Sequence, residues 1–265
     1  MIQMKQKVFE IKIEKDYLKK ILKDAECYDQ KGNLIQGKID FVTEVSKMLL
    51  KSDHFISLTD TNQIYWFDGK VYNIQLADSY IGSAITKYSN LLNYSFTPTS
   101  QQRDMVFQRI KTAQTSLINR GDLDANPNLV CLENGVFSLS EKKLLPHSSD
   151  YLTSIKLPII YDPNATIVGS KFEKFLNEIV EKPEDIKILQ EFFGYIFNDK
   201  NIYEKILLLV GSGQNGKSVL LEVLRHFVGN LNVTSVILQS LKNRFESSKL
   251  YGKLLCFNVI WAISH

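Results

Sequence analysis

Residues 207–221 read LLLVGSGQNGKSVLL, an apolar run followed by a glycine-rich turn and the start of an amphipathic segment. Within it, GSGQNGKS fits the P-loop pattern GxxxxGK(S/T), in which glycines let consecutive backbone N–H groups converge on phosphate oxygens. The helix after such a turn directs its positive end at the anion. The sequence therefore predicts a buried strand over 204–210, a phosphate-binding loop and a helix that stops at Gly229.

The P-loop pattern also assigns roles to residue types. Lys217 brings a positive charge to the β- and γ-phosphates of a nucleotide, and we expect it to be catalytic. The Ser218 hydroxyl can ligate Mg²⁺. ATP and Mg²⁺ are therefore the expected cofactors. The predicted nucleotide-binding residues are Gly211, Ser212, Gly213, Gln214, Asn215, Gly216, Lys217 and Ser218.

Hydrolysis requires more than this loop, because a second strand must deliver an Asp or Glu to the Mg²⁺. The next predicted strands are residues 232–238 and 253–263, and no Asp or Glu follows Glu246 in the sequence. We therefore expect an incomplete α/β core that binds nucleotide with weak or absent turnover. Whether the chain is an enzyme stays open at this point.

Upstream of the loop, hydrophobic periodicity predicts helices and β-hairpins. QIYWFDGKVYNIQL (63–76) predicts a hairpin that turns at Asp68-Gly69, and residues 126–148 predict a second that turns at Asn134-Gly135. A short strand is expected at residues 9–13. Helical spacing of apolar residues predicts helices over 14–26, 37–51, 79–94 and 101–120, and two more within 169–199.

Two upstream features have both a functional and a structural interpretation. The aromatic side chains of the first hairpin can stack on nucleic-acid bases or fill the core of a sheet, and we favour the core. Asp122 and Asp124 imitate the metal-binding carboxylate pair of primases, but they lie in a predicted loop, and we favour a role without metal. The aromatic residues concerned are Tyr65, Trp66, Phe67 and Tyr72.

Composition excludes several classes of protein. The chain is 44% hydrophobic and 23% charged, as in an ordinary globular protein. Its longest apolar run (254–263) is about half of a membrane span, and its N-terminus lacks an apolar signal-peptide core. Cys27, Cys131 and Cys256 lack metal-binding spacing and indicate reduced thiols. We therefore expect a cytoplasmic protein without a membrane partner.

Charge is unevenly distributed along the chain. Residues 200–265 contain eight Lys or Arg and three Asp or Glu, a balance of +5, although the whole chain carries only +3. A basic segment suits a nucleotide or DNA, and a solvated basic face is the alternative. Charge alone does not decide between the two.

Taken together, the motifs resemble superfamily 3 helicases of the phage and plasmid primase-helicase type, which are related to poxvirus primase-helicases. The similar segments run in order from Lys51 to Phe257, and their combination is more specific than the P-loop alone. They are LTDTNQIYWFDGKVY (58–72), LENGVFSLSEKKLLPHSSDYLTSIKLPIIYDPNA (132–165), PEDIKILQEFFGYIFN (183–198), the P-loop segment and LQSLKNRFESSKLYGKLL (238–255).

Residues 156–165 predict an edge strand followed by a linker, so we expect a domain boundary near residues 162–170. The resemblance implies an α/β protein. It also implies a ring-forming homo-oligomer that translocates on single-stranded DNA with ATP during replication of a virus, phage, plasmid or integrated element. Arg244 belongs to the family pattern without a role that we can assign. The expected segments are an N-terminal extension (1–50), a pre-helicase α+β domain (51–165), a helical collar (166–200) and a truncated P-loop core of the AAA-like type (201–265).

The resemblance is incomplete at its C-terminal end. The family continues with a strand that ends in Asp or Glu, whereas FNVIWAISH follows here, and the family's arginine finger would lie beyond His265. An alternative function is therefore a non-catalytic assembly module that docks onto intact helicase subunits. A small-molecule P-loop kinase is a third interpretation, and it would need a substrate lid downstream.

Overall fold

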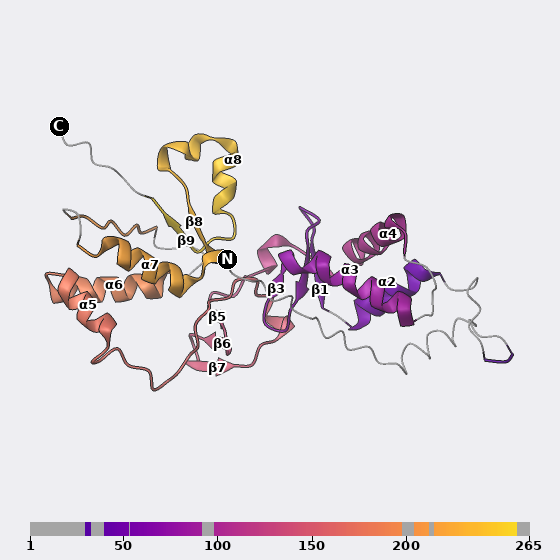
Figure 1. Cartoon of the computed structure of the whole chain (residues 1–265), viewed down its shortest axis with the longest axis horizontal. Coiled ribbons are helices and arrows are strands. Elements are labelled where there is room, and N and C mark those ends of the chain that lie inside the picture. The colour runs from indigo at the N-terminus through magenta and orange to yellow at the C-terminus, as the bar shows by residue number, and fades with distance from the viewer. Residues whose placement is uncertain are drawn as a thin grey trace. The chain divides into compact units, whose positions relative to one another are not determined.

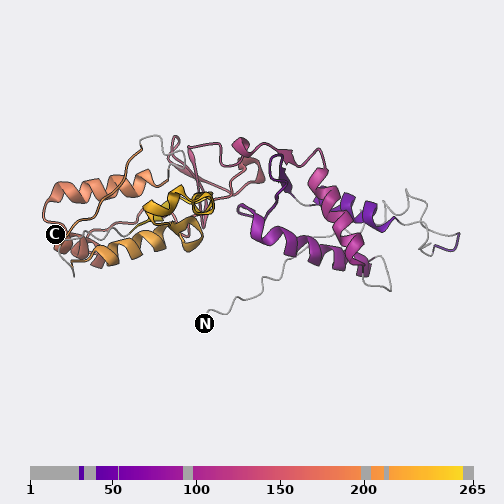
Figure 2. The same ribbon diagram turned by 90° about the horizontal axis from the view of Figure 1, so that it is seen from above.

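The computed structural model describes residues 30–32, 40–52, 54–91, 98–197, 204–211 and 215–258. Helices and strands are mixed throughout, which confirms the predicted α/β class (Figures 1 and 2). The chain divides into two compact units. Unit 1 comprises Met1–Ala125 with Ser148–Ser154, and unit 2 comprises Asn126–His147 with Ile155–His265. The expected boundary near 162–170 falls within unit 2, and the assignment of functional domains stays a prediction.

Unit 1 contains a four-stranded sheet in the order β3-β2-β1-β4. Antiparallel pairing joins β1 to β2 and β2 to β3, whereas β1 and β4 run parallel. The elements of unit 1 are α2 (Phe41–Ser52), β1 (Phe55–Leu58), β2 (Ile64–Phe67), β3 (Tyr72–Asn73), α3 (Ile74–Leu91), α4 (Ser100–Thr112), β4 (Leu117–Ile118) and the 3₁₀ helices η2 (Arg120–Asp122) and η3 (Ser149–Tyr151).

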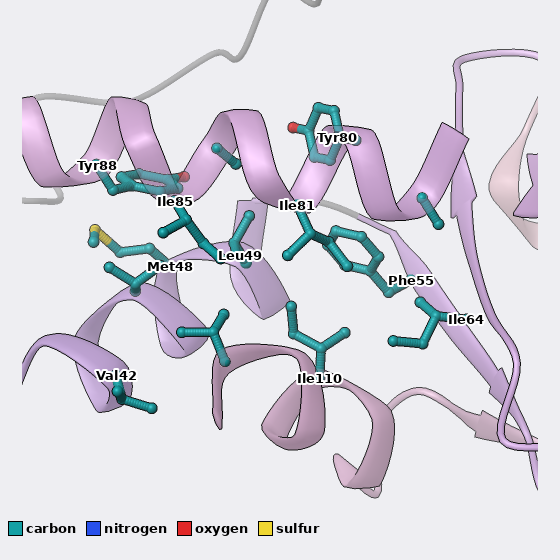
Figure 3. Close-up of a cluster of buried hydrophobic side chains, with 14 of the residues drawn as sticks. Val42, Met48, Leu49, Phe55, Ile64, Tyr80, Ile81, Ile85, Tyr88 and Ile110 are labelled. Atoms are coloured by element: carbon teal, nitrogen blue, oxygen red, sulfur yellow. The ribbon is translucent and has the colours of Figure 1, made fainter. Parts of the chain in front are cut away.

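One core of unit 1 lies between the sheet and its three α-helices. Figure 3 shows Ile81 and Ile85 of α3 pointing toward Leu49 of α2 and Ile110 of α4, with Phe55 of β1 beside them. All five side chains are buried. Because α2, α3 and α4 each contribute one apolar stripe, burial of these stripes against the sheet stabilises the unit.

The aromatic side chains of the first hairpin lie in cores, as the structural interpretation predicts. Tyr65 and Tyr72 are buried in a second cluster, which also includes Phe67. Trp66 faces the helices and stacks on Tyr80, with ring centroids 3.9 Å apart. These rings therefore fill the two faces of the sheet and do not form a stacking platform for bases.

The hairpin turn is confirmed at Asp68-Gly69. Gly69 has a φ of 92°, and Asp68 Oδ1 accepts hydrogen bonds of 3.0 Å from the backbone N–H groups of Lys70 and Val71. The second arm is shorter than predicted because α3 begins at Ile74. Asn73 Oδ1 accepts a hydrogen bond from the N–H of Leu76 at 3.1 Å, which starts the helix there.

The helix predicted over 101–120 ends early. α4 stops at Thr112 because Ala113 is extended, with φ −64° and ψ 121°. Leu117 then enters β4 and pairs with Ser57 of β1. The helical spacing of Leu117 was misleading, since pairing with a distant strand determines its conformation. The strand predicted at 9–13 and the helix predicted over 14–26 lie outside the described residues.

Unit 2 contains a three-stranded antiparallel sheet in the order β5-β6-β7 and a parallel pair, β8 and β9. α5 and α6 confirm the two helices predicted within 169–199, and α6 begins at Pro183. The elements of unit 2 are β5 (Leu129–Leu132), β6 (Gly135–Ser138), β7 (Lys143–Leu145), α5 (Lys171–Ile179), α6 (Pro183–Tyr195), α7 (Lys217–Val228), η4 (Asn230–Asn232), β8 (Val233–Ser235), η5 (Leu238–Lys242), α8 (Arg244–Ser247), η6 (Ser248–Leu250) and β9 (Leu255–Phe257).

The second hairpin turns one residue earlier than predicted. Leu132 pairs with Gly135, so Glu133 and Asn134 form the turn. Gly135 is required because a Cβ at this position would lie 2.5 Å from the carbonyl oxygen of Leu145. The expected edge strand at 156–165 is reduced to one parallel bridge, in which Leu157 N–H donates to the Cys131 carbonyl at 2.9 Å.

The prediction of a buried strand over 204–210 is wrong. Among the described residues, no strand pairs with this segment. Ile206, Leu208 and Val210 are 89%, 67% and 82% exposed. The intervening Leu207 and Leu209 pack against helices α5, α6 and α7. The segment therefore alternates like a strand that has one packed face, but it pairs with no strand in the part of the chain that the structure describes.

Candidate functional site

The candidate site is the turn of unit 2 that leads into α7. α7 begins at Lys217 after Gly216, as predicted, and Gly229 ends it by donating its N–H to the Arg225 carbonyl at 2.8 Å. Five of the eight predicted nucleotide-binding residues are described. They are Gly211, Asn215, Gly216, Lys217 and Ser218. Ser212, Gly213 and Gln214 lie outside the described residues.

Two features favour glycine at position 216. Its φ is 81°, in the left-handed region that favours glycine. A Cβ would also lie 2.4 Å from Cγ2 of Ile179 and 3.2 Å from Cε2 of Phe175. Helix α5 therefore supports the turn directly. Sequence reasoning missed this support, although the amphipathic pattern of residues 171–179 indicated that α5 has a packing face.

Helix α7 is anchored by its own apolar stripe. Leu220, Leu224 and Val228 are buried, and Leu220 packs in a cluster with Leu176 of α5 and Leu189 of α6. The stripe holds the start of the helix against the helices that support the turn. The free N–H groups of the first helical turn carry a partial positive charge, which is the environment that a phosphate group prefers.

Lys217 closes the loop by bonding to two of its oxygens. Its Nζ donates to the Gly211 carbonyl at 2.9 Å and to Oδ1 of Asn215 at 2.6 Å. The side chain of Asn215 packs on Gly211, because a Cβ there would lie 1.9 Å from Nδ2 of Asn215. The ammonium group thus lies between the first and last described parts of the loop. Both its acceptors are uncharged, so anionic phosphate oxygens would be stronger partners.

The features of the loop fit a phosphate group. Gly211 and Gly216 allow the close approach of Asn215 and Ile179, and Lys217 supplies a cation beside the helix N-terminus. Ser218 is exposed in the first turn of α7, where its hydroxyl can reach a metal ion that a nucleotide brings. Among the described residues, no group of three or more His, Cys, Asp or Glu side chains could hold a metal ion.

The residue directly after β9 carries an amide and not a carboxylate. β9 runs parallel to β8 and ends at Phe257, and Asn258 follows it. Nδ2 of Asn258 is buried without a hydrogen-bond partner. Arg225 of α7 lies over the Phe257 ring at 5.7 Å, so this end of the strand packs against the helix that follows the loop.

Asp122 and Asp124 have structural partners. Oδ2 of Asp122 accepts the backbone N–H of Asn119 at 3.0 Å. Asp124 accepts the backbone N–H of Ser154 at 2.7 Å and its hydroxyl at 2.5 Å. These bonds give both carboxylates a structural role, and those of Asp124 tie residue 154 to the rest of unit 1. Arg244 begins α8.

A cavity of about 520 Å³ in unit 1 was not predicted. It is lined by the turn before β2 and by side chains of α3 and α4, including Asp78, Asp104 and Lys111 around Phe107. Its lining comes from segments that are distant in sequence, so no local pattern indicates it. Within the described residues, no helix is long and apolar enough to span a membrane.

Comparison with protein-family models gives a match. A family model described as "D5 N terminal like" matches residues 45–181, from α2 to the end of α5. The match includes both hairpins and ends before the P-loop. A search of the curated proteins finds no match.

Proposed function

Because the chain belongs to the D5 N-terminal-like family, the pre-helicase region of a primase-helicase family, we propose that it is the ATP-binding part of a DNA-replication helicase. The family match supports the replication context. The loop after the matched residues supports the nucleotide. A virus, phage, plasmid or integrated element is the expected source of such a protein.

The observation that carries this proposal is the position of Lys217. Its ammonium group lies at the start of α7 and bonds to two uncharged oxygens of the loop, at 2.9 and 2.6 Å. A β- or γ-phosphate would replace these acceptors with charged ones and would meet the N-terminal N–H groups of the helix. Gly211 to Ser218 would hold the phosphates, and the Ser218 hydroxyl would ligate Mg²⁺.

We propose that this chain binds ATP with little turnover. The bound Mg²⁺ would neutralise phosphate charge, but a carboxylate is also needed to hold the metal and position water. Asn258 follows β9, where the family pattern has an acidic residue. Lys217 would then serve chiefly as a binding residue in this chain.

Single-stranded DNA and a ring of identical subunits belong to the proposal for the intact helicase. The +5 balance of residues 200–265 supports a polyanionic partner. ATP-driven translocation along the strand would be the activity of that assembly.

One observation favours a second candidate, a non-catalytic assembly module. Ile206, Leu208 and Val210 present an exposed apolar row beside the loop, on a segment whose backbone has no strand partner among the described residues. An intact helicase subunit could cover this row. Such docking would bury apolar area and satisfy the open backbone groups.

Two assays on the purified chain test the proposal. Steady-state phosphate release from ATP with Mg²⁺ should stay near background, with or without a poly-dT oligonucleotide. Clear ATP hydrolysis by the wild-type chain that is lost in Lys217→Ala would contradict the proposal that the chain turns over little ATP. Size-exclusion chromatography with an intact D5-type helicase addresses the second candidate: a chain that never co-elutes with it rejects the assembly module.

A further inference from the structure

Asn215 bonds to the lysine that the nucleotide would need. Its Oδ1 accepts a 2.6 Å hydrogen bond from Lys217 Nζ, which is shorter than the 2.9 Å bond from the same nitrogen to the Gly211 carbonyl. Charge-assisted bonds of this length are stronger than neutral ones. Of the two oxygens that accept hydrogen bonds from the Lys217 ammonium group, Oδ1 of Asn215 is therefore the nearer.

The other end of the Asn215 amide packs on Gly211. Nδ2 of Asn215 occupies the space where a Cβ on Gly211 would lie, 1.9 Å from the ideal position. One side chain thus covers the glycine at the start of the loop and holds the lysine at its end. This placement is specific to an amide of this length, with one end apposed to the glycine and the other accepting from the lysine.

We propose that Asn215 is a positioning residue that holds Lys217 while the site is empty and competes with phosphate for it. The inference rests on the proposed nucleotide site, in which Oδ1 of Asn215 competes with the phosphate oxygens for the Lys217 ammonium group. A nucleotide must displace the 2.6 Å bond before Lys217 can reach its phosphates. The Asn215 side chain therefore sets the affinity through the empty state and is not itself a ligand of the nucleotide, whereas its backbone N–H stays part of the phosphate-binding loop.

The chemistry of an amide suits this role. Asn Oδ1 accepts strongly enough to orient an ammonium group, but it carries no charge that would repel phosphate. An Asp at the same position would hold Lys217 as an ion pair and would place a negative charge in the phosphate site. The inference therefore predicts opposite effects for Asn215→Ala and Asn215→Asp.

The first arm of the test uses the protein without nucleotide. Lysines are labelled with ¹³C and ¹⁵N, and the Lys217 side-chain signals are assigned by their loss in Lys217→Ala. Asn215→Ala should shift these signals, and Asn243→Ala should not. Asn243 is an exposed control residue of the same unit without a side-chain capping bond. Unchanged Lys217 signals in Asn215→Ala would overturn the inference.

The second arm measures the affinity for ATP with Mg²⁺ by calorimetry. Removing the competitor should tighten binding by about twofold to tenfold in Asn215→Ala, the range expected for loss of one hydrogen bond in water. Asn215→Asp should weaken it at least about tenfold, because its carboxylate opposes the phosphates. Weaker binding in Asn215→Ala would mean that Asn215 contacts the nucleotide directly, and it would overturn the inference.

The two arms separate the inference from the proposed function. If wild-type protein binds no ATP but the Lys217 signals still respond to Asn215→Ala, the nucleotide site is wrong and the Asn215–Lys217 contact stands. If ATP binds and the signals do not respond, the inference fails alone. Thermal melting checks that each variant is folded. If Asn215→Ala is unstable, Asn215→Ser replaces it, because the shorter serine side chain carries its acceptor oxygen farther from Lys217.

Discussion

Gly216 and Ile179 approach so closely that a Cβ on the glycine would lie 2.4 Å from Cγ2 of the isoleucine. The glycine directly precedes α7, and the isoleucine is the last residue of α5. The shape of the candidate site therefore depends on a helix about forty residues earlier in sequence, which lies within the stretch that matches the family model.

Gly216→Ala should destabilise unit 2 and weaken ATP binding. The new methyl group overpacks against Ile179, and alanine is strained at a φ of 81°. Together these effects should lower the free energy of unfolding by about 2–4 kcal/mol. Urea denaturation measures the loss. Gly194→Ala in α6 is the matched control, because nothing lies within 4 Å of its Cβ position. Equal stability of the two variants would contradict the packing account.

Gly135→Ala should disrupt the second hairpin. A Cβ there would meet the Leu145 carbonyl at 2.5 Å and Cγ of Leu144 at 2.9 Å, so β6 and β7 would have to separate. We expect a loss of about 1–3 kcal/mol, as for other overpacked sites. Hydrogen exchange should become faster at the β5–β6–β7 amides and stay unchanged in unit 1. Retained protection at these amides would show that the close approach has no energetic consequence.

Stability of unit 1 should fall at alkaline pH because of Tyr72. Burial raises the pKa of the Tyr72 hydroxyl above its ordinary value of 10.0, and the nearby Asp150 carboxylate adds to this, against a smaller opposing effect of a hydrogen bond with Ser149. The unfolded chain releases this proton at the ordinary pKa, whereas the folded unit retains it. The contribution is therefore complete below pH 10 and is lost as the pH rises through the raised pKa.

Urea midpoints measured between pH 8 and pH 11 test this expectation. The midpoint of wild type should decline above about pH 10, and Tyr72→Phe, which cannot ionise, should decline less steeply. A Tyr72→Phe profile parallel to that of wild type would contradict the assignment to Tyr72.

The segment before the loop should respond differently on its two faces. Changing Ile206, Leu208 and Val210 together to Thr removes exposed apolar area, so the melting temperature should hardly change and self-association should decrease. Leu207→Ala removes a side chain packed among the helices, and it should cost about 1–3 kcal/mol, less than a fully buried leucine. Light scattering measures self-association, and thermal melting measures stability. A large loss of stability in the triple variant would contradict the assignment of Ile206, Leu208 and Val210 to an exposed face.

Local signals in the sequence predicted much of this structure. The Asp68-Gly69 pair predicts the hairpin turn in which it lies. Pro183 predicts a helix start and Gly229 a helix end, because of their backbone chemistry alone. Features that depend on distant partners were not predictable in this way. Residues 204–210 have the pattern of a strand but pair with no strand within the described ranges, and Leu117 leaves a helical pattern to pair with Ser57.

The candidate site was predictable in part for the same reason. The GxxxxGK(S/T) spacing identifies Lys217 and Ser218 because loop chemistry is local. The contact of Gly216 with Ile179 and the bond of Asn215 to Lys217 depend on packing and side-chain conformation. No sequence pattern of the loop contains that information.

The most direct test of the central claim is a fluorescence titration of the full chain with a labelled ATP analogue in the presence of Mg²⁺. The account predicts saturable binding that unlabelled ATP displaces. Lys217→Ala should bind at least about tenfold more weakly, because it removes a charged hydrogen-bond donor to phosphate, while its melting temperature stays close to that of wild type. Absence of binding to the wild-type chain, or equal affinity in Lys217→Ala, would contradict the account.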